Sequence, residues 1–238
     1  MKGKRIIVTG GTTGIGRATI ALLAGRGARI VTVGRDPDAL KEALDGFADL
    51  PGEVHGVSAD LGTPEGIETL FATADAQLGG LDALVSNAAL GAEPIDEMAD
   101  ADWRYVVSVN LMGAMAAARG ALARLRDGGQ IVMVGSISAS IHAPGESVYS
   151  ATKAGIRAFV ETLRKEVASR GIRVGVVEPG TTGSDMQAAD PTEQEEQIAR
   201  DQMLRAEDVA EAIAFLLDRP ARVDIVSLRI EPRLQELP

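Results

Sequence analysis

Short runs of β-branched and other apolar residues alternate along the chain with longer segments in which Ala and Leu recur about every 3.6 residues. The short runs predict strands over Arg5–Thr9, Arg29–Val33, Glu53–Ser58, Ala83–Ser86, Gln130–Gly135, Arg173–Val177 and Asp224–Ile230. The longer segments predict helices over Gly16–Arg26, Pro37–Phe47, Pro64–Leu78, Ala101–Leu125, Ser147–Ser169 and Ala206–Leu217. Such alternation is typical of a parallel sheet with helices on both faces. We therefore predict an α/β protein with a single seven-stranded, doubly wound sheet.

One segment interrupts this rhythm. From Thr181 to about Arg200 the chain is polar, and its middle, Asp190 to Glu196, is acidic. An irregular stretch of this length inside a compact domain is usually a functional lid or a disordered insert. No change of composition marks a second domain, so residues 1–238 are expected to form one domain with a lid at about 181–200.

Composition excludes several classes of function. The 24 Lys and Arg residues against 34 Asp and Glu give a net charge of -10, which provides no general attraction to nucleic acid or to anionic lipid. Without cysteine and with two histidines, the chain has no thiolate nucleophile, and a metal site is not expected. A Gly-x-Ser-x-Gly elbow is absent, which disfavours a hydrolase. With no signal peptide or long apolar span, we expect a cytoplasmic protein without nucleic-acid or membrane partners.

A glycine-rich turn follows the first predicted strand. Gly10, Gly14 and Gly16 lie in the sequence GGTTGIG, directly after Arg5–Thr9 and before a predicted helix. The first strand-to-helix turn of a parallel sheet presents helix N-terminal amides at the carboxyl edge, where they can bind an anion such as a pyrophosphate. A tight turn can require glycine without any ligand, but three spaced glycines at this place favour a dinucleotide site. The spacing is Gly-x-x-x-Gly-x-Gly, which differs from Gly-x-Gly-x-x-Gly.

The end of the second predicted strand bears on cofactor choice. An acidic residue there would bind a ribose 2′-hydroxyl, whereas an arginine accommodates a 2′-phosphate. The chain reads Val33-Gly34-Arg35-Asp36, in which Gly34 leaves room and Arg35 supplies a planar donor fork. This favours NADP over NAD. In the alternative reading Arg35 is a solvated loop residue and Asp36 caps the helix that begins at Pro37, and both can hold together.

A tyrosine and a lysine four residues apart open the fifth predicted helix. The spacing places Tyr149 and Lys153 on one helix face, about a turn apart. A free tyrosine has a pKa near 10, and a nearby cation would lower it and so favour proton transfer near neutral pH. Ser136, at the end of a predicted strand, would bring its hydroxyl to the same sheet edge. Taken alone, the pair could also be a tyrosine packed on the core beside a solvated lysine.

Together these motifs resemble those of the short-chain dehydrogenase/reductase family, from Thr9 to about Leu217. The matching pieces are the Gly10 to Gly16 turn, Asp60-Leu61, Ser86-Asn87-Ala88-Ala89, Asn110, Ser136, Tyr149, Lys153 and Pro179-Gly180. The chain departs from the common Asn-Ala-Gly pattern at Ala89 and from a Val-Asp-Gly-Gly tail at its end. The resemblance implies a Rossmann-type fold and hydride transfer between a nicotinamide cofactor and a small alcohol or carbonyl substrate. It also implies a homodimer or homotetramer.

The same resemblance implies a role for each matching residue. Tyr149 would be the general acid in reduction and the base in oxidation, and Ser136 would hydrogen-bond the substrate oxygen. Lys153 would bind the nicotinamide ribose and lower the pKa of Tyr149, while Asn110 would position a relay water. The implied cofactor-binding residues are Gly10, Thr12, Thr13, Gly14, Ile15, Gly16, Arg35, Asp60, Leu61, Asn87, Ala88, Ala89, Tyr149, Lys153, Pro179, Gly180 and Thr182.

Some alternatives remain at this stage. Ser138 competes with Ser136 for the serine role, although the thirteen-residue spacing to Tyr149 matches Ser136. A catalytically silent nucleotide sensor or scaffold of the same fold is the second function considered, and the complete set of Asn110, Ser136, Tyr149 and Lys153 argues against it. Dehydratases and epimerases of a longer related family usually carry a larger C-terminal substrate region. The substrate itself is not specified by the sequence.

Overall fold

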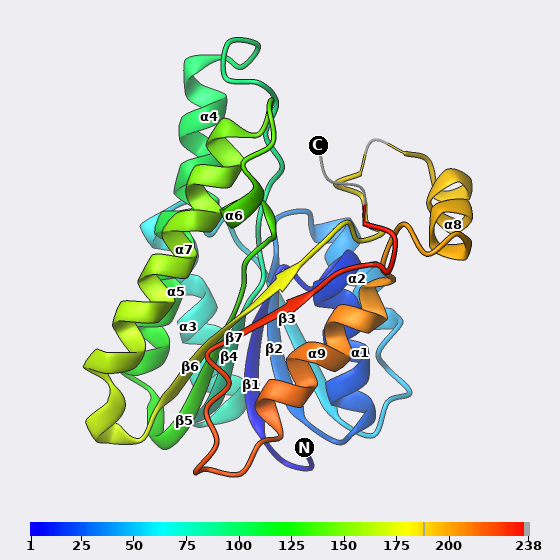
Figure 1. Cartoon of the computed structure of the whole chain (residues 1–238). Coiled ribbons are helices and arrows are strands. Elements are labelled where there is room, and N and C mark those ends of the chain that lie inside the picture. Colours follow the sequence, from blue (N-terminus) through cyan, green and yellow to red (C-terminus); the bar gives the residue numbers. More distant parts are fainter. Residues whose placement is uncertain (188, 236–238) are drawn as a thin grey trace.

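A single parallel sheet runs through the centre of the computed structural model, which describes residues 1–187 and 189–235 (Figure 1). Its strand order is β3-β2-β1-β4-β5-β6-β7, and each neighbouring pair is parallel. The strands are β1 (Arg5–Thr9), β2 (Arg29–Gly34), β3 (Glu53–Ser58), β4 (Leu81–Ser86), β5 (Leu125–Val134), β6 (Arg173–Pro179) and β7 (Ser227–Ile230). The predicted α/β class and the seven strands are confirmed.

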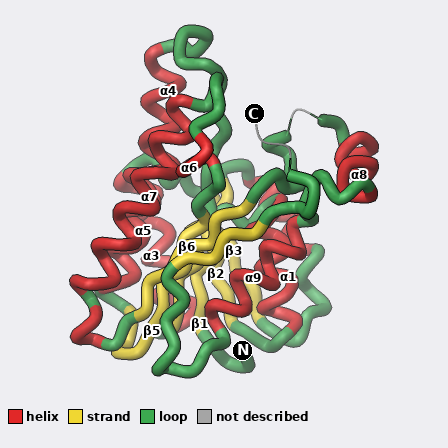
Figure 2. The backbone as a smooth tube through the Cα atoms, in the orientation of Figure 1, coloured by secondary structure: helices red, strands yellow, loops and turns green. Residues whose placement is uncertain are grey.

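Helices cover both faces of this sheet (Figure 2). They are α1 (Gly14–Gly25), α2 (Pro37–Asp45), α3 (Pro64–Leu78), α4 (Asp100–Val107), the π-helix η1 (Ser108–Gly113), α5 (Ala114–Leu122), α6 (Ser138–Ile141), α7 (Ser147–Glu166), the 3-10 helix η2 (Ala168–Arg170), α8 (Pro191–Ala199) and α9 (Ala206–Leu217). One hydrophobic core joins the sheet to α3, α5 and α7, and a second joins it to α1, α2 and α9.

Neighbouring residues of a strand belong alternately to the two cores. Ile7 of β1 belongs to the core under α3, α5 and α7, whereas its neighbour Ile6 belongs to the core under α1 and α9, and both are fully buried. Successive strand side chains point to opposite faces, so a central strand must be apolar at every position. Burying each such side chain stabilises the fold by about 1.5–3 kcal/mol.

The long helix predicted over Ala101–Leu125 is not continuous. The chain forms α4, then a π-helical turn over Ser108–Gly113, then α5, and Leu125 already belongs to β5. π-helical turns are rare and often occur at functional sites, and this one contains Asn110. Helical periodicity in the sequence does not reveal such a turn, because inserting one residue shifts the apolar pattern only slightly.

The stretch Asp100–Leu122 is long and apolar enough to pass a test for a membrane span, which the sequence pattern had not suggested. Its alanines account for much of that apolar character. Ala114, Ala117, Ala118 and Ala121 are buried in the core beneath α5, where small side chains let the helix approach the sheet closely. The stretch therefore has a structural reason to be apolar.

The segment predicted to be irregular contains a helix. Asp190 accepts hydrogen bonds from the backbone N–H groups of Thr192 and Glu193 and so caps α8, whose first residue is Pro191. A capping Asp before Pro is a helix start signal, but the following residues are too polar to show an apolar face. Before the helix, Thr182 forms an isolated parallel bridge with Leu204, which ties the segment to the body.

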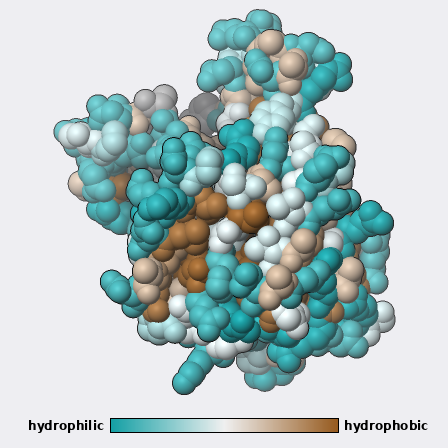
Figure 3. All heavy atoms as spheres, turned by 180° about the vertical axis from the view of Figure 1, so that it is seen from behind, coloured by the Kyte–Doolittle hydropathy of each residue, from teal (hydrophilic) through white to brown (hydrophobic). Residues whose placement is uncertain are grey.

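The strand order reverses direction between β1 and β4. Because β2 and β3 lie on one side of β1 and β4 to β7 on the other, the connections leave β1 and β4 in opposite directions and open a crevice at their carboxyl ends. Seen from behind, two lobes rise above a notch with apolar residues gathered below it (Figure 3). In Figure 1, one lobe contains α8 and the other contains α4 and α6.

Candidate functional site

The glycine turn forms the floor of the crevice. Gly10 has φ +68°, and a Cβ there would lie 2.8 Å from the Cα of Ala88. Gly14, which begins α1, has φ +50°. Only glycine adopts such a conformation so close to a neighbouring backbone without strain. The Gly10 N–H donates to the Val33 carbonyl oxygen at 3.0 Å, and the turn then brings Thr12 to Ile15 to the cleft at the N-terminus of α1, where backbone N–H groups can bind an anion.

Two other glycines near the crevice have packing roles. A Cβ on Gly16 would lie 2.0 Å from the carbonyl oxygen of Gly10, so Gly16 lets α1 begin close beneath the turn. This packing role is compatible with the predicted place of Gly16 in the dinucleotide turn. A Cβ on Gly34 would lie 2.4 Å from the Thr12 methyl group, which confirms that this position is crowded beside the turn.

Asn87 and Thr9 join the end of β4 to the end of β1. The Asn87 carboxamide donates to the carbonyl oxygens of Thr9 and Gly10 at 3.1 and 3.0 Å. The Thr9 hydroxyl accepts from the backbone N–H groups of Asn87 and Ala88 at 2.9 and 3.0 Å. Four hydrogen bonds thus hold together the carboxyl ends of β1 and β4, between which the crevice opens.

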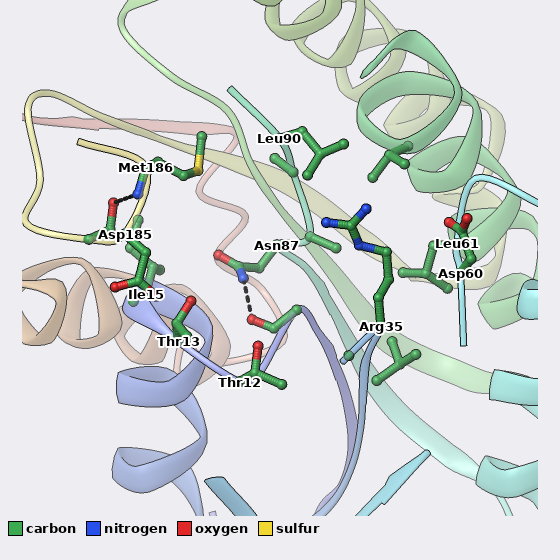
Figure 4. Close-up of a pocket in the computed structure, with 18 of the residues that line it drawn as sticks. Thr12, Thr13, Ile15, Arg35, Asp60, Leu61, Asn87, Leu90, Asp185 and Met186 are labelled. Atoms are coloured by element: carbon green, nitrogen blue, oxygen red, sulfur yellow. Dashed lines mark hydrogen bonds between the residues drawn. The ribbon is translucent and has the colours of Figure 1, made fainter. Parts of the chain in front are cut away.

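A cleft of about 400 Å³ lies above this floor (Figure 4). It brings together most of the residues predicted to bind a dinucleotide: Gly10, Thr12, Thr13, Gly14, Ile15, Arg35, Asp60, Leu61, Asn87, Ala88 and Ala89. Its far wall is Ser184, Asp185 and Met186, which belong to the segment predicted as a lid. This segment folds back toward the end of β1 only in the tertiary structure, so the sequence alone does not show that it forms a wall of the dinucleotide cleft.

Arg35 reaches into the cleft from the end of β2 (Figure 4). Its Nη1 donates to the Tyr105 hydroxyl at 2.9 Å, and that hydroxyl donates to Oδ2 of Asp60 at 2.9 Å. Tyr105 in α4 therefore connects the guanidinium to the carboxylate, and sequence reasoning missed it. Asp36 accepts from the backbone N–H groups of Asp38 and Ala39, so the predicted helix cap is confirmed beside an arginine that lines the cleft.

A second hollow, of about 100 Å³, adjoins the cleft. Ser136, Tyr149 and Lys153 line it together with Asn87, Ala89, Pro179, Gly180 and Thr182. Ser136 follows β5, Tyr149 and Lys153 come from the start of α7, and Pro179 ends β6. The carboxyl ends of parallel strands meet at one edge of the sheet, and this topology brings together Ser136, Tyr149 and Lys153, which we call the trio. The sequence prediction that these side chains gather is confirmed by their positions.

The acid–base properties of the trio differ from our expectation. Burial raises the pKa of Tyr149 to about 12, a hydrogen bond with Ser136 lowers it, and the charge of Glu146 raises it. Burial lowers the pKa of Lys153 to about 8. We expected the Lys153 ammonium to lower the pKa of Tyr149. Instead Lys153 Nζ donates to the Val134 carbonyl oxygen at 3.0 Å and lies 5.4 Å from the Tyr149 ring centre, and burial is the largest influence on the Tyr149 pKa.

Lys153 makes the stability of the chain depend on pH. Its folded pKa of about 8 lies below the ordinary value of 10.5, so the unfolded chain binds more protons between these limits and stability rises with pH there. From about pH 8 to about pH 10, the free energy of unfolding of wild type should rise relative to that of Lys153→Met by up to about 1.4 kcal/mol per pH unit. Urea unfolding of both proteins measures this difference. A constant difference would show that folding does not lower the pKa of Lys153.

Asn110 clamps the chain beyond β4. Its Oδ1 accepts from the Leu90 backbone N–H at 2.7 Å, and its Nδ2 donates to the Leu90 carbonyl oxygen at 2.7 Å. The side chain is buried, and the π-helical turn η1 presents it. Asn110 thereby holds the loop that follows Asn87–Ala89 along the cleft.

A third hollow, of about 300 Å³, opens on the other side of Tyr149. It is lined by Gly91, Ala92, Ser136, Ile137, Ser138, Ile141, Ala143, Glu146, Tyr149, Gly180, Thr181, Met186, Gln187 and Gln235. The Ser138 hydroxyl donates to Oε2 of Glu146 at 2.7 Å, whereas Ser136 is the serine that hydrogen-bonds with Tyr149. Within residues 1–187 and 189–235, no group of three or more His, Cys, Asp or Glu side chains could hold a metal ion.

Comparisons with known proteins agree with this geometry. The family model for short chain dehydrogenase matches residues 4–195. The chain is 37% identical over 218 residues to "Carbonyl reductase family member 4" of Danio rerio, covering 90% of this chain and 91% of that protein.

Two solved structures superpose on most of the chain. A short chain dehydrogenase from Burkholderia cenocepacia in complex with NADP has a TM-score of 0.87 at 30% identity, with 97% of each chain covered. L-sorbose reductase from Gluconobacter frateurii, complexed with NADPH and L-sorbose, has a TM-score of 0.88 at 29% identity, covering 98% of this chain and 96% of that one. With the family model matching most of its length, this chain belongs to the short-chain dehydrogenase family of oxidoreductases.

Proposed function

We propose that the chain is an NADP(H)-dependent oxidoreductase that interconverts a small carbonyl compound and its alcohol, with Tyr149 as the general acid and base. The observation that carries the proposal is the gathering of Ser136, Tyr149 and Lys153 in one hollow that adjoins the cleft lined by Arg35. The names of two similar proteins, a carbonyl reductase and a sorbose reductase with NADPH, support this reaction class.

The residues present fit a phosphorylated dinucleotide. Thr12, Thr13, Gly14 and Ile15 line the cleft at the N-terminus of α1, where backbone N–H groups would bind the pyrophosphate. Arg35 lies at the end of β2 as a planar donor for a 2′-phosphate, and no other Arg or Lys lines this cleft within the described part of the chain. Asp60 and Leu61 would flank the adenine, and Pro179, Gly180 and Thr182 would lie beside the nicotinamide.

The chain's own residues hold the substrate oxygen and move a proton. When bound, NADPH supplies the hydride for reduction of the carbonyl carbon. The hydroxyls of Ser136 and Tyr149 donate hydrogen bonds to the carbonyl oxygen, and Tyr149 then gives up its proton to the forming alkoxide. A pKa of about 12 keeps Tyr149 protonated at neutral pH, which suits the direction of reduction. In oxidation the phenolate is needed, and the Ser136 hydrogen bond and the Lys153 ammonium stabilise it.

We infer that the proton lost by Tyr149 is replaced through Lys153 and a water held near Asn110. The Asn110 side chain is already committed to the Leu90 backbone, so its contribution is to fix the local backbone, whose carbonyl groups can accept from a water.

The experiment that tests the proposed function is a panel of ketones, aldehydes and alcohols assayed by nicotinamide absorbance with NADPH, NADH and their oxidised forms. We expect turnover with NADPH and a carbonyl substrate. A chain that binds NADPH tightly but turns over no member of a broad panel would instead be the nucleotide sensor considered above. Light scattering of the same preparation tests the expected homodimer or homotetramer.

Replacing Tyr105 with Phe tests the hydrogen-bond chain in the cleft. The substitution removes the hydroxyl that bridges Arg35 and Asp60 but leaves the ring beneath the guanidinium, whose carbon lies 5.6 Å from the ring centre. We expect the Kd for NADP to rise by roughly tenfold, the value of a hydrogen bond of about 1.5 kcal/mol to a charged group. Fluorescence titration measures it. An unchanged Kd would show that Arg35 needs no support from Tyr105.

A further inference from the structure

We propose that Glu146, together with Ser138, selects the substrate: a carbonyl compound that carries a hydrogen-bond donor, hydroxyl or ammonium, beside its carbonyl group, and that has no carboxylate there. This inference rests on the proposed function, because it places the substrate against Tyr149. It adds a specificity-determining residue and a substrate class to the proposed reaction.

Glu146 is part of the same hollow as the reacting groups. It lies three residues before Tyr149, just ahead of α7, and both line the 300 Å³ hollow with Ser136 and Ser138. Its charge acts on the Tyr149 hydroxyl strongly enough to raise the pKa of that group. Because Ser136, Tyr149 and Glu146 line one hollow, a substrate whose carbonyl oxygen contacts Tyr149 lies within reach of this carboxylate.

The polar groups of the hollow divide into donors and acceptors. Ser136 and Tyr149 supply the donors for the carbonyl oxygen. The Ser138 hydrogen is already committed to Glu146 Oε2 at 2.7 Å, and Gln187 Nε2 uses one of its two hydrogens on the Thr182 carbonyl oxygen at 3.0 Å. What Ser138 and Glu146 offer a ligand are their remaining oxygen lone pairs. A substrate atom beside the carbonyl that donates a hydrogen bond can bind these lone pairs, whereas an apolar group would displace water from them and give no hydrogen bond in return.

Charge adds a second criterion. Among the described residues that line this hollow, Glu146 is the one with a formal charge, and no Lys or Arg stands beside it. In the same part of the chain no basic side chain forms an ion pair with Glu146. A substrate carboxylate next to the carbonyl would meet like charge in a small hollow, whereas an ammonium would gain an opposite charge. The hollow thus rejects 2-oxo acids.

Four ketones of nearly equal size test this selection: hydroxyacetone, aminoacetone, butanone and pyruvate. They share a methyl ketone and differ in the group beside it, which is a neutral donor, a cationic donor, an apolar group or an anion. We expect hydroxyacetone and aminoacetone to have the highest kcat/KM with NADPH, butanone about tenfold less, and pyruvate the least. Equal kcat/KM values for the four ketones, or a preference for pyruvate, would overturn the inference.

Glu146→Gln separates charge from hydrogen bonding, because the amide oxygen still accepts from Ser138. We expect the ratio of kcat/KM for aminoacetone to that for pyruvate to fall by about tenfold or more, mainly through KM, while hydroxyacetone changes only a few-fold. Glu161→Gln is the matched control, because this exposed residue lies on the outer part of α7 and its loss changes the net charge equally. An equal change in both variants, or none in Glu146→Gln, would contradict the role of Glu146.

Binding without turnover distinguishes this inference from the proposed function. Ketones cannot be reduced by oxidised NADP, so ligand-observed NMR titrations of the four ketones into the chain with oxidised NADP give Kd values alone. Donor-selective binding that Glu146→Gln weakens, in a chain that reduces no carbonyl, would support the substrate class and overturn the catalytic function. Turnover of a carbonyl compound, combined with ketone Kd values that do not change in Glu146→Gln, would support the catalytic function and overturn the substrate class.

Discussion

Replacing Tyr149 with Phe is expected to lower kcat/KM for carbonyl reduction by roughly three decades or more, which corresponds to about 4 kcal/mol of activation free energy. The phenyl ring still fills the space at the start of α7, but the hydroxyl that bonds with Ser136, and that is proposed to give up the proton, is gone. The affinity for NADPH should change little, because the cleft that contains Arg35 does not depend on this hydroxyl. Stopped-flow assays and fluorescence titration measure the two quantities.

The chain contains a matched control for this experiment. Tyr105 is the other of its two tyrosines, so Tyr105→Phe removes the same atom from the other end of the cleft. At saturating NADPH, Tyr105→Phe should keep kcat near that of wild type. A Tyr149→Phe enzyme with near-normal kcat/KM would overturn the assignment of Tyr149 as acid and base.

Replacing Arg35 with Ala should weaken NADP binding by about ten- to a hundredfold, the range expected when hydrogen bonds of about 1.5–3 kcal/mol to a charged group are lost. NAD has no 2′-phosphate, so its Kd should change only a few-fold. The substitution also releases Tyr105, whose hydroxyl then keeps only its bond to Asp60. The ratio of the two Kd values, measured by titration, is the informative number.

Arg26→Ala serves as the control for the lost charge. Arg26 follows α1 at the end opposite the glycine turn and pairs with Glu211, so its removal changes the net charge equally without touching the cleft. It should leave both Kd values unchanged. If Arg35→Ala weakens NADP and NAD equally, Arg35 does not bind the 2′-phosphate.

Much of the sheet could be predicted from the sequence because buried parallel strands are apolar at every position. The strand Arg5–Thr9 and the helices Pro64–Leu78 and Ala206–Leu217 have the predicted boundaries. The prediction failed where the local pattern carries no signal. The π-helical turn around Asn110 leaves the apolar period almost intact, and the helix Pro191–Ala199 has no apolar face to detect.

Some residues of the candidate site could likewise be predicted from the sequence, and others could not. The glycine turn and the Ser136, Tyr149 and Lys153 trio have fixed spacings along the chain, so the sequence is enough to find them. Tyr105 reaches the site from α4, whose local sequence carries no motif, and only the packing of α4 beside the sheet reveals it. The pKa of Tyr149 could not be predicted either, since it depends on burial, which spacing does not measure.

The hydrogen bonds between Thr9, Gly10 and Asn87 bear on how firmly a ligand can bind. They connect two strands that are far apart in the sequence and satisfy the backbone groups at the floor of the cleft from within the protein. A floor held in this way loses little conformational entropy when a ligand arrives, so more of the interaction free energy appears as affinity. Preorganisation of this kind should make association with the dinucleotide fast, because no backbone rearrangement has to precede it.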